Sequence, residues 1–309
     1  MNTLKVIFMG TPDFAVPSLE ILLKNNINVV AVITAPDKPQ GRGQKIQFSP
    51  VKECALKHGI PVLQPTNLKD PDFLAKLDEI GANLQVVVAF RMLPEAVWSR
   101  PAFGTFNLHA SLLPQYRGAA PINWAIINGE TETGVTTFFL RHEIDTGNII
   151  FQEKEPISES DNAGMLHDRL MIRGAELVLK TVKAIETGQS QAVPQTAVGD
   201  LRHAPKIFKE TCEINWSQPA SMVRNFVRGL SPYPGAWTSI HGRIYKIYEG
   251  VVLTDETAAA ENLEPGKFKT DNRDHLWFKT ADALYSVKRL QPEGKKQMTV
   301  EDFFRGNKL

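Results

Sequence analysis

Short apolar runs alternate with segments of helical periodicity over the first 190 residues. The apolar runs predict strands at 5–9, 29–34, 61–63, 84–90, 105–110 and 135–140, with a further strand at 148–152. The periodic segments predict helices at 15–23, 50–58, 70–80, 120–128 and 162–187. Strands that alternate with helices in this way predict a doubly wound α/β domain with a mostly parallel sheet.

The boundaries of the long helix are marked by residues that begin and end helices. Asp161 stands where an acidic cap is expected, and Gly188 follows the last periodic residue. A helix over 162–187 that is capped by Asp161 is therefore expected to close the first domain.

The pattern changes near Gln189. Residues 189–204 are polar and predict a linker. Beyond it, one helix is expected at 221–228, and short strands at 237–240, 243–248, 276–279 and 283–290. Short strands with Gly and Pro turns predict a small β-barrel. The chain is thus expected to comprise an α/β domain at 1–189, a linker at 190–204 and a barrel at 205–309.

The segment from Ala35 to Lys45 has a composition unlike its surroundings. It is rich in Pro and Gly and carries Lys38, Arg42 and Lys45. Such a segment predicts a mobile surface loop without regular structure. Its cations could hold phosphate groups, although a solvated charged loop is as common.

Composition limits the class of protein. Hydrophobic residues make up 42% and charged residues 22%, which is typical of a globular domain. The net charge of +1 argues against a protein that binds nucleic acid through its overall charge. Two distant cysteines, Cys54 and Cys212, do not predict a disulfide framework or a cysteine zinc site. No apolar run reaches the ~20 residues that span a bilayer, and no secretory signal is recognisable, so a cytoplasmic location is expected.

Two polar residues interrupt an apolar strand in the first domain. Asn107 and His109 are two positions apart, so their side chains emerge from the same face. In a parallel sheet, polar side chains at the carboxyl end of a strand face the crevice that binds ligands. Asp145 follows the next strand and is expected to reach the His109 imidazole.

This set of residue types suits acyl transfer to an amine. The Asn107 amide can stabilise the oxygen that becomes negative in a tetrahedral intermediate. Histidine titrates near neutral pH, so His109 can take a proton from the amine and return it to the departing nitrogen. A carboxylate such as Asp145 can fix the imidazole tautomer and support its charged form. The amine itself is the nucleophile, so no Ser or Cys is required.

Structural roles explain the same residues equally well when they are considered alone. His109 could be a hydrogen-bonded core histidine, and Asp145-Thr146-Gly147 could be a simple turn. His142 and Glu143 stand near Asp145, but no ligand set at metal spacing is evident, so no metal is expected.

A resemblance to a known family extends this interpretation. The segments Asn107–Pro114 and Tyr116–Pro121, together with Ile144–Gly147, resemble the two signatures of the folate-dependent formyltransferases. The resemblance implies that Asn107, His109 and Asp145 are catalytic. It also implies that Ser111, Leu112, Leu113 and Pro114 line the site for 10-formyl-tetrahydrofolate. The implied fold is a Rossmann-like formyltransferase domain with an OB-like C-terminal barrel.

Within that family, the chain is most similar to enzymes whose acceptor is the initiator methionyl-tRNA. The resemblance covers the opening Phe8–Ala15, the basic Asp37–Gly43 loop and several C-terminal segments, among them Arg228–Trp237. It implies that Arg42 and Lys45 bind tRNA, that residues 205–309 contact it, and that the enzyme is a monomer. A sibling that formylates a sugar nucleotide or glycinamide ribonucleotide, a formyl-folate hydrolase, and a tRNA-binding protein without activity are the alternatives.

Overall fold

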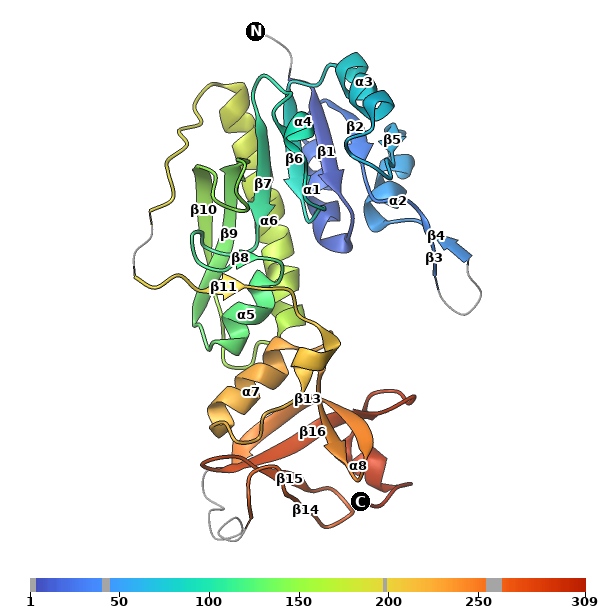
Figure 1. Cartoon of the computed structure of the whole chain (residues 1–309), viewed down its shortest axis with the longest axis vertical. Helices are drawn as coiled ribbons and strands as arrows, with labels where there is room; N and C mark the ends of the chain where they lie inside the picture. The colour runs from blue at the N-terminus through green and yellow to red at the C-terminus, as the bar shows by residue number, and fades with distance from the viewer. Residues whose placement is uncertain (1–3, 41–44, 197–198, 254–262) are drawn as a thin grey trace. The chain divides into compact units, whose positions relative to one another are not determined.

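Two compact units make up the chain in this computed structural model, which describes residues 4–40, 45–196, 199–253 and 263–309 (Figure 1). The first unit comprises Met1–Arg117, Thr133–Glu155 and His167–Arg202. The second comprises Gly118–Glu132, Pro156–Leu166 and His203–Leu309. Within the described residues, no helix is both long enough and apolar enough to cross a membrane.

A seven-stranded sheet forms the centre of the first unit. Its order is β10-β9-β7-β6-β1-β2-β5, comprising Ile149–Pro156, Glu132–Phe139, Thr105–His109, Leu84–Val88, Val6–Gly10, Val29–Ile33 and Val62–Leu63. The five strands from β7 to β5 are parallel, and β9 is antiparallel to β7. The strand order reverses between β1 and β6, so the predicted doubly wound α/β architecture is confirmed.

Helices of the α/β pattern lie close to their predicted positions. They are α1 (Val16–Lys24), α2 (Pro50–Lys57), α3 (Pro71–Ile80), α5 (Pro121–Ile127) and α6 (Ala163–Glu186). A short helix, α4 (Glu95–Trp98), was not predicted, and a 3-10 turn lies at Asp13–Ala15. The side chain that caps α6 is Asn162, whose Oδ1 accepts from Met165 N at 2.9 Å. The Asp161 carboxylate accepts instead from Ser158 N at 2.7 Å. The prediction of Asp161 as the cap was therefore wrong by one residue.

Strand register determines where the polar residues of β7 lie. Gly10 of β1 is beside Val88 of β6, and Val88 is beside Leu108 of β7. The carboxyl ends of these three strands therefore lie side by side at one end of the sheet. Asn107 is beside Val87, which packs in the core cluster formed with α3 and α4. The side chains of Asn107 and His109 consequently emerge on the face of the sheet that α3 and α4 cover, near the carboxyl ends of the strands.

The segment expected to lack regular structure contains a short hairpin. β3 (Lys38–Gln40) pairs antiparallel with β4 (Lys45–Gln47). The prediction of a loop without regular structure was therefore wrong for these residues. The pairing satisfies main-chain groups that Pro and Gly content alone would leave to solvent.

A curled antiparallel sheet forms the centre of the second unit. Its order is β12-β13-β16-β15-β14, comprising Ala236–Ile240, Arg243–Leu253, Leu284–Pro292, Leu276–Lys279 and Phe268–Thr270, and β17 (Met298–Thr299) pairs with β16. Two helices, α7 (Ala220–Gly229) and α8 (Val300–Phe304), supply Val223, Val227 and Phe303 to its apolar core. Shorter elements are a 3-10 turn at Lys209–Cys212 and a pair formed by β8 (Arg117–Gly118) and β11 (His203–Ala204). The antiparallel β-sheet predicted for the smaller C-terminal part of the chain is confirmed.

Candidate active site

His109 lies at the carboxyl end of β7 and is almost completely buried, with 6% of its surface exposed. Its Nε2 is 2.8 Å from the main-chain oxygen of Tyr116. A carbonyl oxygen can only accept, so Nε2 must carry a hydrogen. In the neutral ring, Nδ1 therefore holds the lone pair. The Tyr116 carbonyl, and not a carboxylate, determines which nitrogen can receive a proton.

Asp145 is the residue that faces the other ring nitrogen. Its Oδ2 is 3.9 Å from His109 Nδ1, and the two side chains are 15% and 7% exposed. This distance is too long for a hydrogen bond but within the range of an ion pair when the imidazole carries a second proton. The structure thus brings together the two residues that the sequence placed 36 positions apart.

The turn that carries Asp145 has an unusual backbone. Asp145 has a φ of 54°, in the left-handed region that non-glycine residues rarely adopt. Two residues later, Gly147 lies so close to the β9 backbone that an added Cβ would be 1.6 Å from the Phe139 oxygen. Gly147 is therefore required by local geometry, whereas the backbone conformation of Asp145 is one that a non-glycine residue adopts at a cost.

Asn107 is half-buried on the same face of β7 as His109. Its register neighbours are Val87 on one side and Phe138 on the other, and both are buried apolar residues. Among the described residues, none forms a hydrogen bond with the Asn107 amide. A polar group on an apolar face is stable there only if water or a ligand bonds to it.

The segment Ser111–Pro114 follows β7 and is fixed from the adjacent strands. The buried Thr136 hydroxyl donates to Ser111 O at 2.6 Å and accepts from Leu113 N at 3.2 Å. The Gln152 amide donates to Leu113 O at 2.9 Å. The Leu113 side chain is buried against Phe138, and Ser111 Oγ donates to Gln115 O at 2.6 Å. These two side chains are therefore turned inward, whereas Leu112 and Pro114 are half-buried.

Arg42 lies outside the described residues, and of Lys45 only the backbone, in β4, is described. The residues that flank β3 and β4 are well anchored. The Lys52 ammonium forms an ion pair with Asp37 and donates to Gln64 Oε1 at 2.8 Å. These contacts lower the pKa of Asp37 from its ordinary value, chiefly through the hydrogen bond from Lys52.

Gln195, which the sequence did not single out, contacts the Asp145 turn, and Arg117 of the Tyr116–Pro121 segment contacts Gln195. Gln195, within the expected linker, donates from Nε2 to the main-chain oxygens of Asp145 and Gly147 at 2.8 and 2.9 Å. Arg117 donates from Nε and Nη2 to Gln195 Oε1 at 3.1 and 2.6 Å. No sequence signal identifies Gln195, because a glutamine in a polar segment is an ordinary linker residue.

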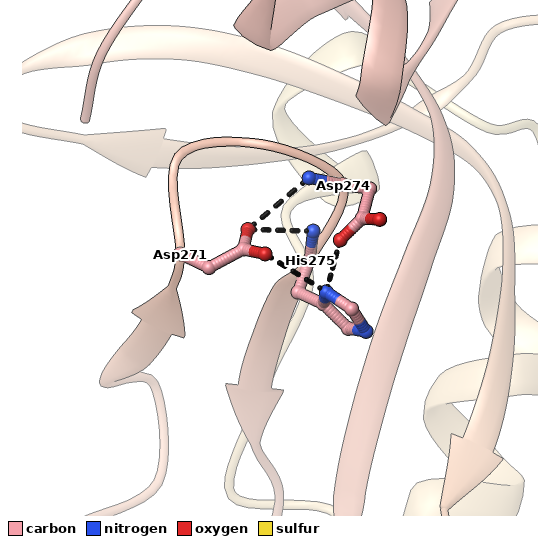
Figure 2. A group of neighbouring side chains, drawn as sticks. All are labelled: Asp271, Asp274 and His275. Carbon is pink, nitrogen blue, oxygen red and sulfur yellow. Dashed lines mark hydrogen bonds and ion pairs between the residues drawn. The ribbon is translucent and has the colours of Figure 1, made fainter.

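A histidine and two carboxylates gather in one turn of the second unit (Figure 2). Asp271 Oδ1 accepts from the main-chain nitrogens of Arg273, Asp274 and His275, and these bonds hold the Asp271 pKa well below its usual range. His275 Nδ1 contacts Asp271 Oδ2 at 3.1 Å and also contacts Asp274. The groups are exposed and bond to one another, so the cluster is explained as a stabilised turn.

Family models match both parts of the chain. The model described as "Formyl transferase" matches residues 4–182, and "Formyl transferase, C-terminal domain" matches residues 206–308. A methionyl-tRNA formyltransferase of Bacteroides fragilis is 53% identical over 311 residues, which cover 98% of this chain and 95% of the relative. A Flavobacterium johnsoniae protein of the same name is 50% identical, with 99% and 97% covered.

Solved structures share the fold at low sequence identity. WlaRD, a sugar 3N-formyl transferase solved with dTDP and 5-N-formyl-THF, has a TM-score of 0.67 at 22% identity and covers 96% of this chain and all of its own. HypX from Aquifex aeolicus, solved with tetrahydrofolic acid, has a TM-score of 0.64 at 17% identity. Its alignment covers 99% of this chain and 48% of HypX.

Proposed function

The chain belongs to the formyl transferase family, and on that premise we propose that it transfers the formyl group of 10-formyl-tetrahydrofolate to the amino group of initiator methionyl-tRNA. The product is N-formylmethionyl-tRNA for translation initiation. The observation that carries this proposal is the full-length similarity to methionyl-tRNA formyltransferases at 50–53% identity. The buried corner of Asn107, His109 and Asp145 supplies groups that suit the chemistry.

The reaction exchanges one carbon–nitrogen bond for another. The free amine of the methionyl group attacks the formyl carbon, and the carbonyl oxygen becomes negative. We assign to the half-buried Asn107 amide, which has no protein partner among the described residues, the role of donating a hydrogen bond to that oxygen. The C–N10 bond then breaks, and the electron pair leaves with N10 of the folate.

His109 moves the proton that this exchange requires. Its Nε2–H is committed to Tyr116 O, so Nδ1 receives the proton that the attacking amine loses. The Asp145 carboxylate, 3.9 Å away, stabilises the resulting imidazolium. The proton then passes to N10 as it departs, and His109 returns to its neutral form. Asp145 therefore supports the charged ring, while Tyr116 O sets the tautomer.

We assign the folate to the carboxyl end of β7, where the segment Ser111–Pro114 begins. Ser111 and Leu113 shape this site through their main chain, because their side chains are buried. Leu112 and Pro114 are the half-buried members that can contact the donor. In the proposed folate site, Ser111 and Leu113 therefore define the shape, and Leu112 and Pro114 contact the folate.

Recognition of the tRNA is assigned to the basic hairpin and to the C-terminal unit. Arg42 and Lys45 would hold acceptor-stem phosphates, where each contact adds salt-dependent affinity. Residues 1–189 would carry catalysis, 190–204 the connection and 205–309 the tRNA contacts. The enzyme is expected to act as a monomer in the cytoplasm. Cys54 and Cys212 are buried free thiols with raised pKa values caused by burial, as is usual for unreactive cysteines.

One competition experiment tests the acceptor. Labelled 10-formyl-tetrahydrofolate is offered with initiator methionyl-tRNA, elongator methionyl-tRNA, glycinamide ribonucleotide, an amino-sugar nucleotide and water. Label is expected only on initiator methionyl-tRNA; label on the sugar nucleotide would refute the assignment. His109→Ala is expected to abolish transfer in a folded protein, and Arg42→Ala to weaken transfer to tRNA through a higher KM.

A further inference from the structure

The Asp145 turn is held by a side chain that lies 50 residues away in the sequence. The Gln195 amide nitrogen donates to Asp145 O at 2.8 Å and to Gly147 O at 2.9 Å, and thus spans the turn. Both carbonyls belong to the segment that presents the Asp145 carboxylate to His109. A single amide therefore fixes the main chain on both sides of Thr146.

Arg117 determines which way the Gln195 amide faces. A glutamine amide can be placed in two orientations, with its oxygen and nitrogen exchanged. The Arg117 guanidinium only donates, so its two bonds require Gln195 Oε1 to face it, at 3.1 and 2.6 Å. The nitrogen is then turned toward the Asp145 and Gly147 carbonyls.

The same short segment of chain also holds His109. Arg117 follows Tyr116, whose main-chain oxygen is 2.8 Å from His109 Nε2. Residues 116 and 117 thus fix one partner of the His109–Asp145 pair directly and the other through Gln195. We call the Arg117–Gln195–Asp145 chain of hydrogen bonds the turn bracket.

The turn needs such support because its backbone is strained. Asp145 has a φ of 54°, a conformation that persists in a non-glycine residue only where surrounding contacts maintain it. Without the bracket, the backbone can relax toward a commoner conformation. The carboxylate would then move from its position 3.9 Å from His109 Nδ1.

We propose that Gln195, aligned by Arg117, is a positioning residue that keeps the Asp145 carboxylate beside His109. The proposal rests on the proposed function, since the position of the carboxylate matters to catalysis only if Asp145 supports the charged His109. It assigns a functional role to a residue in the segment between the two family-model matches. Gln195 acts through the turn and does not touch the reacting atoms.

Two substitutions at Gln195 separate positioning from space-filling. Gln195→Met removes both sets of hydrogen bonds, and kcat is expected to fall by about 10- to 100-fold, as for misplacement of a catalytic group by about 1 Å. KM for the formyl donor and for tRNA should stay near wild type. Gln195→Glu has nearly the same shape and still accepts from Arg117. The introduced carboxylate would present only acceptor oxygens to the Asp145 and Gly147 carbonyls, so the kcat of Gln195→Glu should be no higher than that of Gln195→Met.

Further variants supply the control and a second route to the result. Gln191→Met changes an exposed glutamine in the same segment and should leave kcat unchanged. Arg117→Met breaks the bracket at its other end. It should lower kcat in the same direction as Gln195→Met, and the two losses should not multiply when combined.

A double-mutant cycle with Asp145→Asn provides the decisive test. If Gln195 acts through Asp145, Gln195→Met should have little further effect on kcat in the Asp145→Asn background. If the losses in kcat from Gln195→Met and Asp145→Asn multiply in the double variant, the positioning role is overturned. The positioning role alone is also overturned if Asp145→Asn is slow while Gln195→Met or Gln195→Glu keeps wild-type kcat. Wild-type kcat in Asp145→Asn would instead overturn the proposed role of Asp145, and the positioning role with it.

Discussion

Gly147→Ala places a methyl group where the backbone of β9 already lies. An ideal Cβ at this position would be 1.6 Å from Phe139 O and 2.8 Å from Phe139 C. The obstructing atoms are main-chain atoms of the last residue of β9, which is hydrogen-bonded to Asn148 O, so they cannot rotate away as a side chain would. The turn that contains Asp145 must move instead.

The size of the movement follows from the contact. Cβ atoms in proteins essentially never approach another heavy atom within 3.0 Å, so the gap must widen by about 1.4 Å. Asp145 lies two residues away and shares the Gln195 amide with Gly147. Displacement of this order costs about 100-fold in rate. The forced backbone shift should also destabilise the protein by about 1–3 kcal/mol.

Steady-state transfer of labelled formyl to methionyl-tRNA measures the first effect, and chemical denaturation measures the second. Gly306→Ala is the matched control, since a Cβ there meets nothing within 4 Å and no positive φ opposes it. We expect Gly306→Ala to behave as wild type in both assays. A Gly147→Ala enzyme with wild-type kcat and stability would show that the turn is not packed against β9 as described.

Three other changes test separate parts of the structure. Asn107→Ala should lower kcat by about 10²–10³-fold with little change in KM, because it removes a donor to the developing oxyanion; single-turnover kinetics would show whether the chemical step is slowed. Thr181→Val leaves the buried Thr137 hydroxyl, now 2.8 Å from Thr181 Oγ1, without its partner. The loss should be about 1–3 kcal/mol in denaturant unfolding, and Thr137→Val in the same chain should restore part of it. The hydrogen bond with Asp271 raises the pKa of His275 above its ordinary value of 6.5. The Asp271–His275 pair therefore contributes its full stabilisation below pH 6.5, and this stabilisation is lost as the pH rises through the raised pKa. The stability difference between wild type and Asp271→Asn should therefore be larger near about pH 6 than near about pH 9; equal differences would contradict the pairing.

Local patterning was sufficient to predict most elements. The apolar runs at 84–90 and 105–110 became β6 and β7, and the periodic segment at 162–187 became α6. Each depends on interactions within a few residues, which the sequence displays directly. The errors occurred where neighbouring residues offer competing local arrangements. Asn162 caps α6 although Asp161 is an equally good cap residue, and β3 pairs with β4 across a Gly-rich segment.

In the candidate site, local spacing predicted one feature and could not predict another. The i and i+2 spacing of Asn107 and His109 was enough to place both on one face, because strand side chains alternate. The tautomer of His109 was not predictable, since it depends on a main-chain carbonyl that Tyr116 brings back to Nε2. Main-chain oxygens are present at every residue, so no side-chain pattern indicates which one will accept.

The sequence was sufficient to predict the α/β class, the antiparallel C-terminal sheet and the residue types available for formyl transfer. These follow from periodicity, from turn residues and from short motifs, all of which are local properties. Three contacts could be seen only in the folded chain: Asp145 lies 3.9 Å from His109, Gly147 packs against β9, and Gln195 spans the Asp145 turn. Such contacts join residues far apart in the chain, and their geometry is set by strand register and packing, which no single segment encodes.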